Sequence, residues 1–237
     1  EYYKKDAEAL IRRSARNCFS KSKNNDMNEV VRYIEDTCPI ITNKDIENDV
    51  HLKCLLNGIY NIKTGKFSKE FNPDYIILNQ IPHNYDNKSK FTQIKKRVSQ
   101  IIVDKKNIQS YFDFASTCLH PYTGIDFQFG GVGIAGTGKS QLTDLLFITF
   151  GGDNVSNSPI HRIANDPTTQ KDVAYSMLNI DEESKNSNVE NIEVWKTWIT
   201  QGRMTARSIY GHNINFRPTA RIMFATNTIY EIGNPDD

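Results

Sequence analysis

The sequence has 237 residues, of which 38% are hydrophobic and 24% charged, with a formal net charge of +1. This is the composition of a soluble globular protein with one large domain or two ordinary ones. No uncharged apolar run is long enough to span a bilayer, and the N-terminus has no signal-peptide core, so we expect a cytoplasmic protein with no membrane partner. Because the sequence starts without methionine, we expect a piece of a longer protein.

Lys and Arg are concentrated in the first half of the chain. Residues 1–125 carry 20 of them against 15 Asp and Glu, whereas residues 126–237 carry 9 against 13. The first half is therefore the better candidate for a general nucleic-acid surface. The cysteines are too far from each other and from the histidines for a zinc site or a redox pair, and we expect buried free thiols at Cys18, Cys38, Cys54 and Cys118.

Residues 1–36 predict two helices, because apolar residues recur at helical spacing on both sides of a polar hinge at residues 20–26. Basic side chains form one face of this region, either as a solvated surface or as a phosphate contact: Arg12, Arg13, Arg16, Lys21 and Lys23.

Residues 50–85 predict short strands joined by tight turns. Asn57-Gly58 and Thr64-Gly65 supply the positive φ values that such turns need. We interpret residues 1–87 as a small α+β N-terminal module. On its own it carries no chemistry.

Residues 88–120 return to helical spacing and predict a helical collar at residues 88–122. The collar carries the densest basic run in the chain, either a solvated surface or a face toward nucleic acid: Lys88, Lys90, Lys95, Lys96, Arg97, Lys105 and Lys106. The remaining residues, 123–237, then form a third region.

The third region contains G-I-A-G-T-G-K-S at residues 133–140, which fits the phosphate-binding pattern G-x-x-x-x-G-K-[ST] without mismatch. Residues 127–132 before it predict a buried strand, and residues 141–148 after it predict a helix. Glycines let the backbone fold around phosphate oxygens, and the helix N-terminus attracts the anion. We expect ATP and Mg²⁺ here, with Lys139 on the β- and γ-phosphates and Ser140 on the metal. The expected nucleotide-binding residues are Gly133, Ile134, Ala135, Gly136, Thr137, Gly138, Lys139, Ser140 and Gln141.

A second acidic motif follows downstream. We expect the helix after the loop to end at Gly151-Gly152, residues 153–170 to form a polar connection, and residues 171–175 to close a helix. Residues 176–180 then predict an apolar strand that stops in acids. We expect Asp181 to hold Mg²⁺ and Glu182 to polarise the attacking water, with Glu183 as a register alternative.

The last stretch predicts a helix over residues 192–199, a hairpin and one more strand. Residues 204–216 alternate in two arms around Gly211, and Arg207, Tyr210 and His212 offer a cation, a ring and a donor suited to single-stranded DNA. An ordinary surface hairpin is the alternative. Residues 221–227 predict a buried strand that would place the Asn227 amide against the γ-phosphate.

The order of these motifs resembles the superfamily 3 helicases of viruses, phages and plasmids, in particular the poxvirus-type and satellite-phage-type primase–helicases. The discriminating part is the block W-K-T-W-I-T-Q-G-R-M-T-A-R-S-I-Y followed by F-R-P-T-A-R-I-M-F-A-T-N. The segments L-L-N-G-I-Y-N-I-K-T-G-K-F and D-Y-I-I-L-N-Q-I-P-H-N-Y-D resemble the module that precedes the ATPase in that group.

The resemblance implies an α/β fold, a P-loop, AAA+-like parallel sheet with flanking helices, behind the α+β module and the collar. It implies a replicative DNA helicase, from a phage or mobile element in a host cytoplasm, that works as a hexameric ring. Such a ring pulls single-stranded or forked DNA in the 3′ to 5′ sense, in company with other replication proteins. Lys139, Glu182 and Asn227 would be catalytic, and Ser140 and Asp181 would hold the metal.

The alternatives are an initiator or DNA-packaging ATPase, and a nucleotide-gated origin-binding module without unwinding activity. In that family the arginine finger lies beyond the strand that corresponds to residues 221–227, here called the sensor strand because Asn227 would sense the γ-phosphate. This sequence stops ten residues after Asn227. Arg217 and Arg221 precede the sensor and are poor replacements. We therefore expect this fragment to bind nucleotide and to hydrolyse it poorly.

Overall fold

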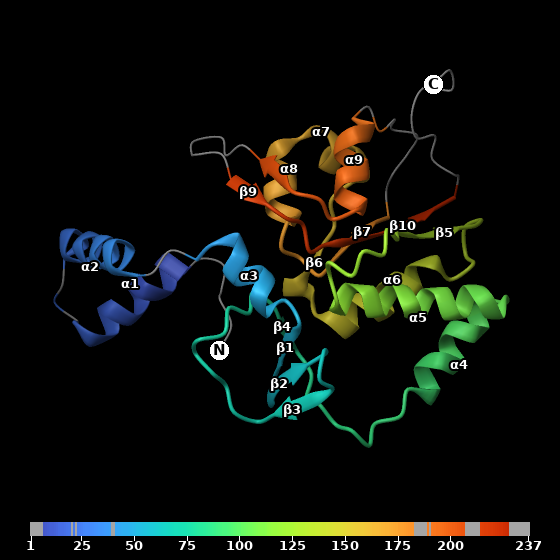
Figure 1. Ribbon diagram of the computed structural model, residues 1–237, viewed down its shortest axis with the longest axis horizontal. Coiled ribbons are helices and arrows are strands. Elements are labelled where there is room, and N and C mark those ends of the chain that lie inside the picture. Colours follow the sequence, from blue (N-terminus) through green and yellow to red (C-terminus); the bar gives the residue numbers. More distant parts are fainter. Residues whose placement is uncertain are drawn as a thin grey trace.

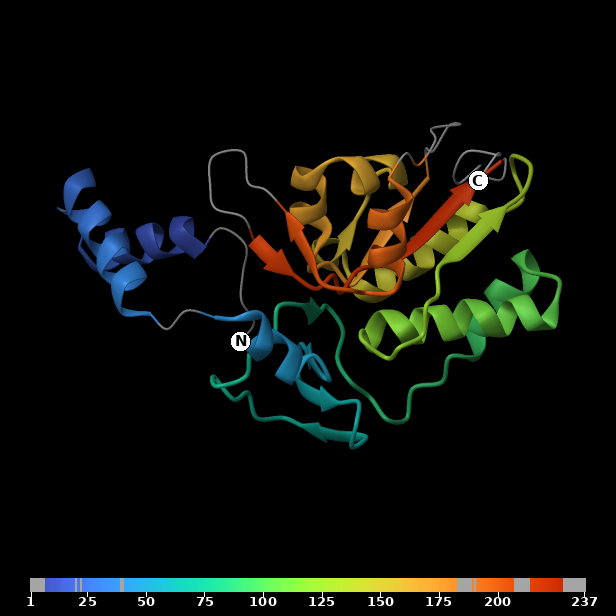
Figure 2. The same cartoon turned by 45° about the horizontal axis from the view of Figure 1, so that its top comes forward.

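The computed structural model describes residues 7–19, 21, 23–38, 41–182, 189, 191–206 and 214–227. Three parts follow one another along the chain: a helical hairpin, a small mixed sheet, and a larger body around a parallel sheet (Figure 1). The mixed and parallel sheets lie against each other, whereas the hairpin projects to one side (Figure 2).

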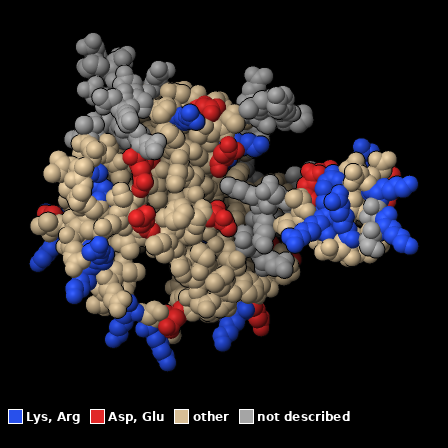
Figure 3. Space-filling model, turned by 180° about the vertical axis from the view of Figure 1, so that it is seen from behind, with Lys and Arg blue, Asp and Glu red and all other residues tan. Residues whose placement is uncertain are grey.

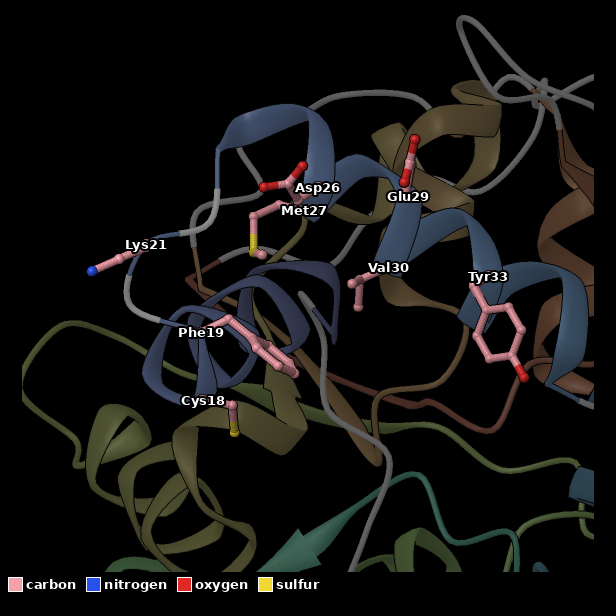
Figure 4. A pocket seen from close by; sticks show the side chains of 8 residues that line it. All are labelled: Cys18, Phe19, Lys21, Asp26, Met27, Glu29, Val30 and Tyr33. Atoms are coloured by element: carbon pink, nitrogen blue, oxygen red, sulfur yellow. The ribbon is translucent and has the colours of Figure 1, made fainter.

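The hairpin consists of α1 (Ala7–Cys18) and α2 (Asn24–Thr37), as the spacing of apolar residues predicts. Met27 and Val31 of α2 are buried between the two helices. Basic side chains gather on this projection (Figure 3). A hollow of about 920 Å³ lies beside Phe19, Val30 and Tyr33 (Figure 4). It is remote from the third region of the chain, so it is no part of the site described below.

The mixed sheet has the order β3-β2-β1-β4, with β1 (Leu52–Leu55), β2 (Gly58–Asn61), β3 (Lys66–Ser68) and β4 (Gln80–Ile81). β1, β2 and β3 pair antiparallel through the predicted turns, and β4 pairs parallel with β1. The helix α3 (Asn43–Asp49) precedes this sheet and was not expected. Thr42 caps it, and the Thr42 hydroxyl and backbone N–H both donate to the Asp45 carboxylate (2.6 and 2.8 Å).

The mixed sheet is fastened to the body through residues around β4. The Asn79 amide donates to the Tyr175 carbonyl oxygen (3.1 Å), and the Asn154 amide donates to the Gln80 carbonyl oxygen (2.6 Å). Ile81 belongs to the body's hydrophobic core. These contacts join parts of the chain more than 70 residues apart.

The body contains a four-stranded parallel sheet of order β5-β10-β7-β6, with β5 (Phe129–Val132), β6 (Val155–Ser156), β7 (Leu178–Asp181) and β10 (Arg221–Thr226). Its pairings are all parallel. An α/β fold with a parallel sheet and flanking helices, preceded by an α+β mixed sheet, is therefore confirmed.

Two hydrophobic cores lie on opposite faces of the parallel sheet. On one face pack α4 (Thr92–Ile101), α5 (Lys105–Leu119) and α6 (Lys139–Phe150), against Leu178, Ile180 and Met223. On the other face pack α7 (Ile160–Asn165), α8 (Pro167–Val173), α9 (Ile192–Ile199) and the hairpin strands β8 (Met204–Ala206) and β9 (Ile214–Phe216).

Two expectations about this body were wrong. The strand before the loop was expected to be buried, but β5 is an edge strand of the described sheet and Val132 is 47% exposed. Residues 153–170 were expected to form a polar connection, yet they contain the 3₁₀ turn Gly152–Asn154, β6, α7 and half of α8. The buried Asn179 side chain explains this, because it bonds the Ser156 hydroxyl and both backbone groups of Ser158, which lets a polar sequence join the sheet.

Two smaller findings concern cysteines and membranes. Cys54 and Cys118 are buried free thiols as expected, but Cys18 and Cys38 are exposed because they end the two helices of the projecting hairpin. No helix among the described residues combines the length and apolar composition needed to cross a membrane.

Candidate functional site

The phosphate loop, residues 133–140, runs from the end of β5 into the start of α6. Gly136 and Gly138 adopt φ values of +80° and +91°, which side chains other than glycine rarely accept. Gly138 is the residue before the first turn of α6, so the N–H groups of that turn face the loop. The sequence GTGK thus has glycine at the two positions where the backbone needs it.

Lys139 is the first residue of α6, and its side chain reaches back into the loop. Its ammonium group donates to the carbonyl oxygens of Gly133 (2.5 Å) and Ile134 (2.9 Å), and to the side-chain oxygen of Asn227 (3.0 Å). Asn227 directly follows β10, the neighbour of β5 in the sheet, where Thr226 lies opposite Val132. The structure therefore brings together two predicted residues that are 88 positions apart.

Glu182 lies on the same side of the sheet as α6. Its carboxylate accepts a hydrogen bond from the Thr143 hydroxyl, which is also 2.9 Å from the carbonyl oxygen of Ser140. Thr143 is one turn beyond Ser140, so Glu182 is tied to the first turn of the helix that follows the loop. Sequence reasoning missed Thr143, although its spacing of three from Ser140 on a helix was a usable signal.

Asp181 lies on the opposite face. Its carboxylate is 2% exposed and accepts the backbone N–H of Ile160 at the start of α7 (2.8 Å). Successive side chains of a strand alternate between faces, and Ile180 belongs to the core beneath α6. The two acidic residues therefore lie on different sides of the sheet, and the structure associates Glu182, not Asp181, with the loop helix. Glu183 lies outside the described residues.

The loop's remaining groups suit a nucleotide phosphate and a small hard cation. Ser140 and Gln141 are exposed at the first turn of α6. Within the described residues no three His, Cys, Asp or Glu side chains converge on a metal position. Mg²⁺ in nucleotide sites is commonly held by one or two protein groups together with substrate phosphates. A hydroxyl at Ser140 and a carboxylate at Glu182 are such groups.

The predicted hairpin is present in its arms. β8 and β9 pair antiparallel, with Met204 opposite Phe216 and Thr205 opposite Asn215. Arg207, Tyr210 and His212 lie outside the described residues, so their DNA-binding role stays a prediction.

The root of this hairpin is held by three side chains. Tyr122 and Gln201 are the two described non-glycine residues with positive φ, at +64° and +52°, and the Tyr122 N–H donates to the Gln201 side chain (2.8 Å). The Tyr122 hydroxyl donates to the Arg217 carbonyl oxygen (2.8 Å), and the Arg217 guanidinium lies 4.0 Å from the Tyr122 ring centroid. Burial raises the pKa of Tyr122, so the phenol remains a donor at neutral pH.

Arg217 and Arg221, the two arginines that precede Asn227, are both bonded within the chain. Arg217 also donates to the Gln201 carbonyl oxygen (2.6 Å). Arg221 is 2% exposed and donates to the Ile125 carbonyl oxygen (2.8 Å), and burial lowers its pKa from the usual arginine value. Both side chains fasten the segment that connects α5 to β5.

Two family models match the sequence. Residues 1–107 match the family described as "D5 N terminal like", and residues 132–237 match a family of unknown function, DUF5906. No protein with a curated description matches the sequence.

Solved structures of the NrS-1 C-terminal region are similar in fold. The A-form apo structure aligns with a TM-score of 0.53 and 15% identity, over 69% of this chain and 40% of that chain. A second apo structure has a TM-score of 0.46 and 13% identity, over 74% of this chain and 54% of that one. The chain therefore spans about half the length of these structures or less, and at such identities the likeness concerns the fold alone.

Proposed function

We propose that this chain is the nucleotide-binding part of a helicase-type replication protein that binds Mg²⁺ and ATP at residues 133–140 and uses hydrolysis to move single-stranded DNA. The observation that carries the proposal is the Lys139–Asn227 hydrogen bond (3.0 Å), which joins the phosphate loop to the end of the neighbouring parallel strand. If the match to the phosphate-binding pattern were a coincidence, this contact with a polar side chain at the end of the neighbouring strand would not be expected.

In this proposal Lys139 exchanges its carbonyl partners for the β- and γ-phosphates when ATP binds. Asn227, already in contact with Lys139, would bond the γ-phosphate or the attacking water through its amide. When bound, Mg²⁺ would neutralise charge on the phosphate oxygens.

The acidic pair receives modified roles. Glu182 bonds the helix that follows the loop, whereas Asp181 bonds α7. We therefore propose that Glu182, beside Ser140, is the carboxylate that contacts the metal. Asp181 then acts as a positioning residue, which fixes the end of β7 against α7. This differs from the expectation from the sequence, which puts Asp181 on the metal and Glu182 on the attacking water.

DNA and self-association complete the proposal. The β8–β9 hairpin and the basic surfaces of the hairpin α1–α2 and of α4 are the expected DNA contacts, and a ring of six copies is the expected assembly. Their support is the motif order and the presence of the paired hairpin arms.

Because we expect this chain to hydrolyse ATP slowly, the test measures hydrolysis in single turnovers, with and without single-stranded DNA, and strand displacement on a forked duplex. We expect Glu182→Gln to bind ATP and to lose DNA-stimulated hydrolysis by about 100-fold, which is the scale of a lost catalytic group. Glu70→Gln, an exposed glutamate of the mixed-sheet region, is the matched control and should retain both activities. A chain that binds ATP and DNA without any strand displacement would instead be a nucleotide-gated binding module.

A further inference from the structure

The helix α4 lies directly on the phosphate loop, although it begins more than 40 residues before it. Ile101, the last residue of α4, packs on Gly138: a Cβ built on that glycine would lie 3.1 Å from two carbons of the Ile101 side chain. The two helices α4 and α6 are in contact. The C-terminal half of α4 is therefore part of the wall of the nucleotide site.

Arg97, one turn before Ile101, extends its side chain toward the start of α6. One guanidinium nitrogen donates to the Gln141 side-chain oxygen (2.6 Å), and another donates to the Gln100 side-chain oxygen (3.0 Å). Gln141 immediately follows Ser140. Arg97 thus brings a full positive charge to Gln141, the residue next to the predicted metal ligand Ser140.

No carboxylate neutralises this charge within the described part of the chain, where the two ion pairs are Arg12–Glu8 and Lys196–Glu193. Both partners of Arg97 are neutral amides, which orient a guanidinium without cancelling its charge. Such an arrangement leaves donor N–H groups and net charge for an anion.

We propose that Arg97 is a phosphate-binding residue of the nucleotide site and that it contacts the α- or β-phosphate of a nucleotide bound at residues 133–140. The proposal rests on the proposed function, since it requires a nucleotide in the loop. It adds a contact from the helical region before the core, so that nucleotide binding also engages α4.

Arg97 approaches the loop from the side on which we expect the α- and β-phosphates of the nucleotide. Lys139 points toward Asn227, which directly follows β10 and would mark the γ end of the site, whereas Gln141 and Arg97 meet on the side of α4. Backbone N–H groups of a phosphate loop cradle the α- and β-phosphates. A guanidinium beside Gln141 is therefore near phosphates that ADP and ATP share.

The experiment measures the Kd values of ADP and of a non-hydrolysable ATP analogue, each with Mg²⁺, by calorimetry. We expect Arg97→Ala to weaken both nucleotides by the same factor, about 5- to 20-fold, as for loss of a charge-assisted hydrogen bond. Arg97→Lys keeps the charge and should recover part of the affinity. Lys66→Ala removes an exposed lysine of β3, far from α4 in the sequence, and as the control it should bind both nucleotides as the unmodified chain does.

Arg97→Gln separates charge from packing, because a glutamine amide can still bond Gln141. The proposal requires Arg97→Gln to bind as weakly as Arg97→Ala, so unchanged affinity in Arg97→Gln would overturn it. A loss confined to the ATP analogue would overturn the α/β placement. If the unmodified chain bound neither nucleotide, or Lys139→Ala bound both normally, the proposed function itself would fail, which is a separate outcome.

Discussion

The described part of the chain contains two four-stranded sheets, and they differ in which parts of the sequence they bring together. The mixed sheet joins neighbours through tight turns and has a small core of Leu52, Cys54, Ile59 and Ile77. The parallel sheet is covered on both faces and aligns the carboxyl ends of strands from distant parts of the chain. Parallel pairing needs long crossovers, so residues far apart in sequence meet at one edge. The candidate site lies there for that reason.

The largest expected effect compares one buried leucine from each sheet. Leu178 of β7 is 0% exposed between two covered faces, and Leu52 of β1 is 5% exposed in the four-residue core. We expect Leu178→Ala to lower the free energy of unfolding by about 3–5 kcal/mol, and Leu52→Ala by about 2–3 kcal/mol. Urea denaturation measures both. Equal losses would mean that the mixed sheet is packed as tightly as the parallel one.

A pair of turn glycines comes next. Gly138 has φ +91° and contacts Ile101, whereas Gly65 has φ +68° in the mixed sheet with one atom, the Tyr60 hydroxyl, at 3.9 Å. Alanine strains the backbone at either position by about 1–2 kcal/mol. We expect Gly138→Ala to weaken ATP binding by about 10- to 100-fold, since the loop must change shape. ATP titrations of Gly65→Ala should match the unmodified chain, and a similar loss there would show that the comparison is wrong.

Removing the amide at the sensor position is expected to separate binding from hydrolysis. Asn227→Ala deletes one of three hydrogen bonds to Lys139. We expect the Kd of ATP to change less than about threefold, and the hydrolysis rate to fall about tenfold, because the amide acts on the γ-phosphate in the reacting complex. Single-turnover hydrolysis measures the rate. An unchanged rate would remove Asn227 from the mechanism.

The smallest expected effect is a pH dependence from the mixed sheet. Lys53 of β1 is half-buried and donates to the Val50 carbonyl oxygen (2.8 Å), and burial lowers its pKa from 10.5 to about 8. Between pH 8 and 10.5 the unfolded chain therefore binds more protons at this residue, so the Lys53 contribution to stability rises with pH. We expect a gain of about 1–2 kcal/mol from pH 8 to 9.5.

Buried thiols change the free energy of unfolding with pH in the opposite sense. The free energy of unfolding of the unmodified chain is therefore compared with that of Lys53→Met, and the difference isolates the Lys53 gain. Burial raises the pKa of Cys54 and Cys118, and their contribution falls as pH rises. Denaturation at several pH values should show the rise in the unmodified chain and in Lys66→Met, and its loss in Lys53→Met. A rise that persists in Lys53→Met would assign it to another group.

Local signals predicted much of the fold. The phosphate loop, the helix after it, the acidic strand and the hairpin arms each follow from spacing or from glycine chemistry within about ten residues. The meeting of Lys139 with Asn227 required one further step, the parallel pairing of β5 and β10. That step came from the order of motifs.

What failed depended on tertiary contacts. β6 consists of two residues with polar neighbours, and it joins the sheet through the buried Asn179 side chain. So short a strand has no hydrophobic periodicity that would predict it. The face of the sheet on which Asp181 lies depends on the alternation of β7 and on the Ile160 N–H, and the metal-binding role expected for Asp181 stays a prediction. By contrast, the Thr42–Asp45 cap of α3 was readable in the sequence.

The central claim is that residues 133–140 bind a nucleotide triphosphate through Lys139. Calorimetric titration of Mg²⁺ and ATP into the unmodified chain, Lys139→Ala and Lys66→Ala compares one lysine from each sheet directly. The account predicts saturable binding in the unmodified chain and in Lys66→Ala, and a loss of at least about 100-fold in Lys139→Ala. Binding that is absent from the unmodified chain, or equal in the two variants, would contradict it.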